Sequence, residues 1–158
     1  MVKRDKVQIR TMEIDDIPAV FHMGEKLFTA EKHPTLYRTW DEYEVTHFFN
    51  IEPDLCLVAS KGDTVIGFAL GNTIEKPQTA WNYGYLVWLG VAGKYQKYGI
   101  AGKLLDAMTE RLRGMGMRIL IADTQADNKA AIDFFKKYGF ANPTKHVYMS
   151  LNLETTEE

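Results

Sequence analysis

The chain is poor in cysteine, has no strong excess of either charge and contains no long apolar run. Cys56 is its only cysteine, so no disulfide can form within the chain and the paired cysteines of a zinc finger are missing. The formal net charge of −2 gives no basic surplus for nucleic acid. No apolar run approaches the roughly 18 residues of a membrane span, and no signal-peptide pattern follows the charged start. We therefore expect a cytoplasmic protein that binds no metal, nucleic acid or membrane.

The composition is that of one ordinary globular domain. Apolar residues make up 46% of the chain and charged residues 25%, which is enough for one sizeable core. Because we find no repeat, linker or low-complexity segment, residues 1–153 are predicted to form a single domain, and residues 154–158 an acidic tail. Cys56 lies in an apolar run, which is typical of a buried small side chain rather than a reactive thiol.

Hydrophobic periodicity predicts the order of strands and helices. Strands are expected over residues 7–10, 55–60, 64–72, 83–91, 118–124 and 147–153, with a further short one near Phe140, and helices over residues 15–28, 39–49, 100–114 and 128–138. Asp15 or Asp16 can cap the first helix, and Thr39 opens the second with capping-box spacing. Hairpins come first and strand–helix–strand crossovers later. The expected fold class is therefore α/β (α+β), a mixed central sheet of about six or seven strands with helices on both faces.

The most informative segment is a turn rich in small residues between the strand ending at Val91 and the helix opening at Ile100. The first N–H groups of a helix lack internal partners and lie at the positive end of its dipole, so they can hold a phosphate. Gly99, Ala101 and Gly102 leave room there, and lysines 97 and 103 add positive charge. The glycines alone are equally compatible with a plain strand-to-helix turn. The spacing matches neither a dinucleotide fingerprint nor a nucleoside-triphosphate loop.

Two motifs resemble signatures of the GNAT superfamily of N-acetyltransferases. Gln96-x-x-Gly99-x-Ala101 resembles the family's pyrophosphate signature and follows a strand that ends in Leu-Gly-Val, as in the family. The stretch 128–140, with its Asn, Ala, aromatic pair and final Gly-Phe, is similar to the second signature. The motifs occur in the family's order and are separated by one strand. The resemblance spans residues 9–153, is specific over residues 86–140 and is architectural elsewhere.

The resemblance implies that acetyl-CoA is the co-substrate. The backbone of Leu89 and Val91 would pair with the pantetheine arm like an added strand, in a gap where the fourth strand splays from the fifth. Asn128 would bond the arm from the other side, act as a helix N-cap, or do both, and Phe135 would pack against the thiol. The pyrophosphate would be held by one continuous segment, namely Gln96, Lys97, Tyr98, Gly99, Ile100, Ala101, Gly102 and Lys103.

The resemblance implies fewer catalytic residues than cofactor-binding residues. The family often has a tyrosine as the proton donor to the thiolate, and Phe135 stands in its place. The proton could then come from water or from another hydroxyl group, or the thiolate could leave without a proton donor. Tyr138 is more typical of a core residue than of such a donor. The branch that acetylates protein N-termini, including the ribosomal-protein alanine acetyltransferases, has a carboxylate at the spacing of Asp123, acting as general base through water. The alternative is that Asp123 ends a strand and caps the next turn. A backbone N–H near Val91 would donate a hydrogen bond to the oxyanion of the tetrahedral intermediate.

The acceptor is expected to be a primary amine of a small molecule or of a protein N-terminus. Asp123 favours a peptide, whereas the acidic and aromatic region around the first two helices suits a polyamine or an aminoglycoside-like cation. The same residues are also typical of solvated helix faces. That region contains Glu25, Glu31, His33, Tyr37, Asp41, Glu42 and Glu44. Four aromatics along one strand, interpreted as sheet packing or as a wall beside the acceptor, are Trp81, Tyr83, Tyr85 and Trp88.

The sequence therefore predicts an acetyl-CoA-dependent N-acetyltransferase that acts by direct attack of the amine in a ternary complex. Phe135 and the single candidate base keep one alternative open, a catalytically weak or inactive acetyl-CoA-binding domain with a sensor or regulatory role. A different phosphate-binding α/β protein is a further alternative. The family resemblance and the exposed aromatics are compatible with a homodimer.

Overall fold

The computed structural model describes residues 6–29, 38–78 and 80–154. The chain divides into two compact units, Met1–Asp123 and Thr124–Glu158. In the described residues, no helix is both long and apolar enough to span a bilayer.

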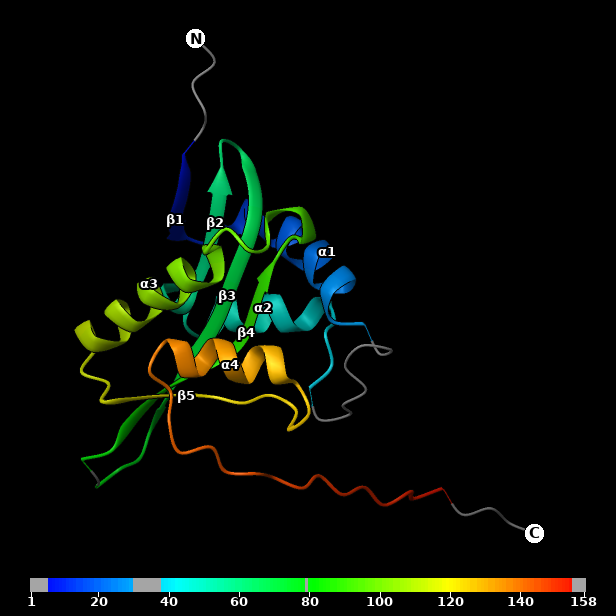
Figure 1. Cartoon of the computed structure of the whole chain (residues 1–158), viewed down its shortest axis with the longest axis vertical. Coiled ribbons are helices and arrows are strands. Elements are labelled where there is room, and N and C mark those ends of the chain that lie inside the picture. The colour runs from blue at the N-terminus through cyan, green and yellow to red at the C-terminus, as the bar shows by residue number, and fades with distance from the viewer. Residues whose placement is uncertain (1–5, 30–37, 79, 155–158) are drawn as a thin grey trace. The chain divides into compact units, whose positions relative to one another are not determined.

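The first unit is built on a five-stranded sheet (Figure 1). Its strands are β1 (Val7–Thr11), β2 (Cys56–Lys61), β3 (Thr64–Glu75), β4 (Asn82–Val91) and β5 (Ile119–Ala122), in that spatial order. Neighbours from β1 to β4 are antiparallel, whereas β5 runs parallel to β4. The predicted mixed sheet is confirmed, with five strands among the described residues instead of the six or seven expected.

Helices cover both faces of this sheet (Figure 1), as predicted. They are α1 (Ile17–Leu27), α2 (Glu42–Ile51) and α3 (Ile100–Gly114). On one face, Val20 of α1 and Val45 of α2 join a buried cluster with Phe68 of β3. On the other face glycines admit α3, since a Cβ added at Gly84 would lie 2.5 Å from a methyl group of Leu112. Apolar burial on both faces thus fixes both helix layers.

The helix caps correct one prediction. The carboxylate of Asp41 accepts hydrogen bonds from the amides of Tyr43 at 2.9 Å and Glu44 at 3.0 Å, so Asp41 is the N-cap of α2. The predicted opening at Thr39 is wrong. Asp41 has the extended backbone that a capping residue needs, and its short side chain reaches the two orphan amides directly.

A β-bulge divides β4 into two halves. Leu70 of β3 lies opposite Trp88 and Gly71 lies opposite Leu86, so Val87 is an extra residue in β4. Because of the extra residue, the alternation of side chains shifts by one, so a position that would face one side of the sheet faces the other side beyond the bulge. Gly84 faces α3, whereas Trp88, four residues later, packs in the cluster under α1 and α2. Alternation within each half therefore places Tyr85 and Trp88 on the same face of the sheet.

The second unit contains α4 (Lys129–Lys137). The side chain of Asn128 accepts a hydrogen bond from the amide of Ala131 at 3.2 Å and caps the helix, as one of its two predicted roles requires. Gly139, with φ of +93°, ends it. The predicted strand over residues 147–153 and the short strand near Phe140 are wrong, because both segments are irregular. Alternating apolar residues favour a strand, but a strand also needs a partner ladder, which alternation alone does not supply.

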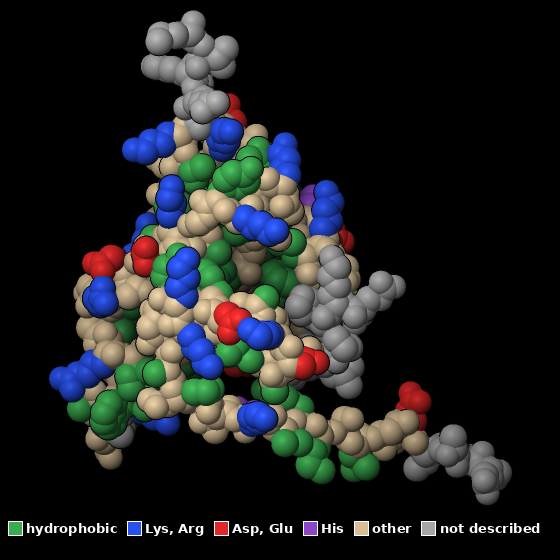
Figure 2. Space-filling model, in the orientation of Figure 1, with side chains coloured by type: hydrophobic (Ala, Val, Ile, Leu, Met, Phe, Trp, Pro, Cys, Tyr) green, Lys and Arg blue, Asp and Glu red, His purple; other side chains and the backbone are tan. Residues whose placement is uncertain are grey.

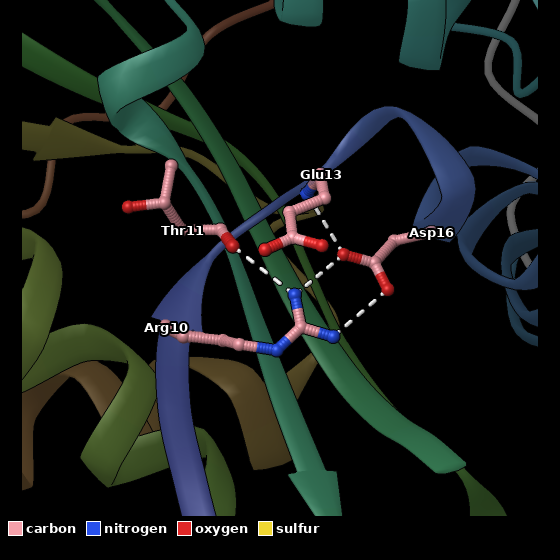
Figure 3. Close-up of polar contacts among 4 residues, drawn as sticks. All are labelled: Arg10, Thr11, Glu13 and Asp16. Atoms are coloured by element: carbon pink, nitrogen blue, oxygen red, sulfur yellow. Dashed lines mark hydrogen bonds and ion pairs between the residues drawn. The ribbon is translucent and has the colours of Figure 1, made fainter. Parts of the chain in front are cut away.

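A partly buried ion pair fastens β1 to the start of α1 (Figure 3). The Arg10 guanidinium donates to both carboxylate oxygens of Asp16, at 2.6 and 2.9 Å, and the Glu13 amide donates to the same carboxylate at 2.8 Å. Asp16 is only 8% exposed. The hydrogen bonds from Arg10 lower the pKa of Asp16 below its ordinary value, although burial acts in the opposite direction.

Asp16→Asn should reduce the free energy of unfolding at pH 7 by about 2 kcal/mol, because a charge-assisted pair is lost and Arg10 is left without its partner. The lowered pKa means that the wild type keeps this contribution above the ordinary Asp pKa of about 3.9 and loses it as the pH falls below that value. Urea unfolding followed by circular dichroism from pH 7 to pH 2.5 should show the two proteins converging.

The control is Asp133→Asn, which removes an exposed carboxylate paired with Lys129 and should leave stability nearly unchanged. A difference between wild type and Asp16→Asn that stays constant down to pH 2.5 would contradict this account.

Candidate active site

The pairing of β4 with β5 covers only part of β4. The two strands are in register from Tyr83 opposite Ile119 to Leu86 opposite Ala122. The register ends there, immediately before the bulge at Val87, and β4 continues to residue 91. This is the predicted splay between the fourth and fifth strands. On the side of β5, the last part of β4 is thus an open edge in the described part of the chain.

At the open edge of β4, the peptide groups that face away from β3 are those of Leu89 and Val91, the two residues expected to pair with the pantetheine arm. The Ala92 N–H donates to the Ile66 carbonyl at 2.9 Å, which makes this a bonded pair of the β3–β4 ladder. In an antiparallel ladder bonded and non-bonded pairs alternate, so Val91, opposite Gly67, belongs to a non-bonded pair. The same holds for Leu89, two residues earlier. The peptide groups of Leu89 and Val91 therefore face away from β3, toward the open side.

A tight turn joins this edge to α3. The side-chain amide of Gln96 donates to the Val91 carbonyl at 3.0 Å and closes the turn onto the end of β4. Two residues of the turn have left-handed backbones, Lys97 with φ of +69° and Gly99 with φ of +75°. Gly99 is the N-cap of α3 and offers no side-chain cap. The turn thus directs the chain into the helix without covering its first amides.

The first amides of α3 lie before the first hydrogen-bonded turn of the helix and have no carbonyl partner within it. The first hydrogen bond of α3 runs from the Lys103 amide to the Gly99 carbonyl at 3.1 Å, so the N–H groups of Ile100, Ala101 and Gly102 have no acceptor one helical turn before them. A Cβ built on Gly99 would meet nothing within 4 Å, so the space beside the amides is open. A diphosphate fits this end of α3, where its charge meets both the amides and the dipole.

The side chains of the predicted pyrophosphate segment differ in what they can contribute. Ile100 and Gly102 are buried against the sheet, so only their backbone amides are available. Lys97, Tyr98 and Lys103 are exposed, with Tyr98 73% exposed, and can move toward a ligand. Figure 2 shows Lys and Arg side chains, with some acidic ones among them, on the face viewed in Figure 1. At the start of α3 itself, Lys97 and Lys103 supply positive charge for an anionic ligand.

On the face of the sheet covered by α1 and α2, the predicted base Asp123 is held by two partners. The Tyr85 hydroxyl donates to its carboxylate at 2.7 Å, and the Arg38 guanidinium donates to the same oxygen at 2.9 Å. Arg38 also approaches the Asp123 backbone carbonyl at 3.5 Å. Burial, followed by the hydrogen bond to Asp123, raises the pKa of Tyr85 well above its ordinary value. Tyr85 therefore keeps its proton at neutral pH.

Arg38 also contacts Trp88, which in turn bonds Glu44 of α2. The Arg38 guanidinium lies 5.0 Å from the centre of the Trp88 ring, a cation–π distance. The Trp88 indole N–H donates to a carboxylate oxygen of Glu44 at 2.7 Å. We call these five residues, Arg38, Glu44, Tyr85, Trp88 and Asp123, the acceptor cluster. Sequence reasoning named Asp123 but missed Arg38, whose partner lies 85 residues away and leaves no local signal.

The other acidic and aromatic residues expected beside the acceptor have different positions. Glu25 pairs with His22 at 3.0 Å on the exposed side of α1. Asp41 caps α2, and Glu42 is exposed on it. Trp81 precedes β4 instead of lying within it. Glu31, His33 and Tyr37 lie outside the described residues.

Asn128 and Phe135 belong to the second unit. The ring of Phe135 packs 5.4 Å from that of Phe134 and 5.0 Å from that of Phe140. The ring of Tyr138 lies 4.8 Å from that of Phe134 and is half-buried, so its interpretation as a core residue stays a prediction. Cys56 is fully buried in the first unit, and burial raises the pKa of its thiol to about 12, so it stays protonated and unreactive, as expected.

Comparison with known proteins finds acetyltransferases among those similar to this chain. N-alpha-acetyltransferase 30 of Schizosaccharomyces pombe is 28% identical over 105 residues, covering 66% of this chain and 69% of its own length. The [ribosomal protein bS18]-alanine N-acetyltransferase of Escherichia coli K12 is 23% identical, covering 86% and 82%. A chain of the NatC complex bound to Gag peptide and CoA has the same fold, with a TM-score of 0.72, 21% identity and coverage of 88% and 87%.

The family model described as the acetyltransferase (GNAT) family matches residues 24–140. That range includes the open edge of β4, the turn into α3, the acceptor cluster and α4. It is more than half of the chain, and the chain therefore belongs to the GNAT family of acetyltransferases.

Proposed function

We propose that this GNAT acetyltransferase binds acetyl-CoA along β4 and at the start of α3, and transfers the acetyl group to a primary amine that reaches the acceptor cluster. One observation carries the proposal. The outward-facing peptide groups of Leu89 and Val91 lead through a short turn to the unpaired amides of Ile100, Ala101 and Gly102. The co-substrate would supply the activated acetyl group as a thioester.

The binding surface suits the two ends of such a ligand. An amide-containing arm can add to the open edge of β4 as a strand would, with its amides bonded to the peptide groups of Leu89 and Val91. A diphosphate can lie against the amides that open α3, where Lys97 and Lys103 add charge from the solvent side. Gln96 would act indirectly, because its side chain already fastens the turn to Val91.

The acceptor cluster supports a role for Asp123 in removing the proton from the amine through water. An amine attacks only in its neutral form, and a peptide N-terminus with a pKa near 8 is partly protonated at pH 7. Two donors orient the carboxylate of Asp123. Tyr85, whose pKa is raised, is a poor proton donor to a thiolate. A thiol is acidic enough, with a pKa of about 8.5, to leave without such a donor.

Gly99→Trp should weaken coenzyme A binding roughly a hundredfold or more, because the indole would cover amides that otherwise bond the diphosphate. Isothermal titration calorimetry measures this directly. Gly116→Trp is the matched control. Gly116 also has a left-handed backbone, with φ of +83°, and open space around its Cβ position, but it lies beyond the other end of α3. Equal affinities in the two variants would remove this turn from the binding site.

Asp123→Asn should lower kcat/KM roughly a hundredfold at pH 7 and recover toward pH 9.5, where the amine is neutral without assistance. Release of free coenzyme A measured across this pH range with a panel of amines and peptides gives the profile. Asp133→Asn, which removes a carboxylate from an exposed pair on α4, should leave the profile unchanged. If Asp123→Asn gives the wild-type profile, Asp123 takes no part in proton removal.

A further inference from the structure

We infer that Glu44 and Trp88 are positioning residues for the proposed base, Asp123. They act through Arg38, whose guanidinium they hold against the carboxylate. Their role rests on the proposed function, in which Asp123 takes the proton of the amine, and they support that step without touching the reacting atoms.

A single run of contacts joins α2 to Asp123. A carboxylate oxygen of Glu44 accepts the indole N–H of Trp88 at 2.7 Å. The Arg38 guanidinium lies 5.0 Å from the centre of the Trp88 ring and donates to the Asp123 carboxylate at 2.9 Å. The four residues come from α2, from β4 and from the segments before α2 and after β5, so only tertiary packing brings them together.

Glu44 holds the indole from a fixed place. It lies in the first turn of α2, where its amide donates to the Asp41 carboxylate at 3.0 Å. The next inward-facing residues of the helix, Val45 and Phe48, are buried in the cluster that also contains Trp88. At Trp88, β4 is paired with β3. The backbone is therefore held on both sides of the contact.

The hydrogen bond selects one orientation of the Trp88 ring. The residue is 5% exposed, and its ring contacts those of Phe28 and Trp40, with centroids 4.8 and 5.1 Å away. Such apolar contacts discriminate weakly between ring orientations, because the χ2 torsion has broad minima. A buried N–H needs an acceptor, so the bond to Glu44 selects among them. The ring face that Arg38 contacts is thereby fixed as well.

Burial of the indole does not by itself require a carboxylate. Trp40, in the same group of aromatic rings, donates its N–H to the backbone carbonyl of Phe21 at 3.0 Å. The bond from Trp88 to Glu44 is shorter, at 2.7 Å, and a carboxylate is the stronger kind of acceptor. The stronger bond is thus made by the ring that also contacts Arg38, as a positioning role requires.

Loss of this contact should affect proton removal and not the co-substrate. Without Glu44 the indole N–H is left unsatisfied and the ring can turn, so Arg38 loses one of its two supports. The Asp123 carboxylate then keeps Tyr85 as its firmly held donor. The open edge of β4 and the first amides of α3 are backbone groups, so binding of acetyl-CoA should be unchanged.

The test measures release of free coenzyme A from acetyl-CoA between pH 6.5 and 9.5. Glu44→Ala should lower kcat about tenfold at pH 7 with an unchanged KM for acetyl-CoA, and the loss should shrink toward pH 9.5, as for Asp123→Asn. Glu44→Gln keeps an oxygen that accepts the indole N–H and should restore most of the rate. Trp88→Phe removes the N–H and should resemble Glu44→Ala, so it gives the same comparison if Glu44→Ala does not fold.

A double-mutant cycle separates positioning from general damage. In the Asp123→Asn background, Glu44→Ala should cost less than about a further twofold, because no base remains to be positioned. Trp40→Phe is the matched control for Trp88→Phe. It removes the same N–H from the adjacent ring, whose partner is a backbone carbonyl, and should lower stability while leaving the pH profile unchanged.

A second measurement needs no activity. In ¹⁵N-labelled protein, the guanidinium N–H signals of Arg38 should exchange slowly with water in the wild type and in Glu44→Gln, and much faster in Glu44→Ala.

If Glu44→Gln were as impaired as Glu44→Ala, the charge of Glu44 would matter and not its hold on Trp88, and the positioning role would be wrong. A tenfold further loss in the Asp123→Asn background, or Arg38 signals that Glu44→Ala leaves unchanged, would also overturn it. Failure of the proposed function gives a different result, in which the wild type binds coenzyme A but releases none from acetyl-CoA with any amine. The Arg38 signals then still decide whether Glu44 holds the guanidinium in place.

Discussion

The extra residue at Val87 is the constraint on which the rest of the candidate site depends. Because β4 has one residue more than β3 at this point, the strand bends and its faces exchange. Pairing with β5 stops at Leu86, directly before the bulge. Among the residues that the structure describes, the end of β4 then pairs with β3 alone. A regular strand of the same sequence would keep Tyr85 and Trp88 on opposite faces.

Two different surfaces of β4 follow from this bend. Along its edge, the peptide groups of Leu89 and Val91 are directed to the open side and continue into the amides of α3. On its face, Tyr85 and Trp88 stand beside each other, and Arg38 joins both to Asp123. The edge suits an extended anionic co-substrate and the face suits an amine. In the proposed function, one irregularity in one strand thus gives the surface for acetyl-CoA and the surface for the amine adjacent places in the first unit.

The sequence predicted those parts of the molecule that depend on near neighbours. Gly99 and the small residues after it indicated the turn and the start of α3, and Asn128 indicated the cap of α4. The bulge at Val87 and the pairing of Arg38 with Asp123, 85 residues away, leave no local pattern, because both depend on which strands and loops meet. The segment 147–153 shows the opposite failure. Its alternation indicated a strand, but it is irregular, with Met149 and Leu153 exposed.

The central claim is that a diphosphate lies against the amides at the start of α3. Nuclear magnetic resonance of ¹⁵N-labelled protein, titrated with coenzyme A and separately with pantetheine, tests it most directly, since only coenzyme A carries the diphosphate. The account predicts that coenzyme A shifts the amide signals of Gly99 to Gly102 strongly, and that pantetheine shifts those of Leu89 and Val91 while leaving the first group nearly unchanged. Coenzyme A shifts that spare Gly99 to Gly102 and gather elsewhere would contradict it.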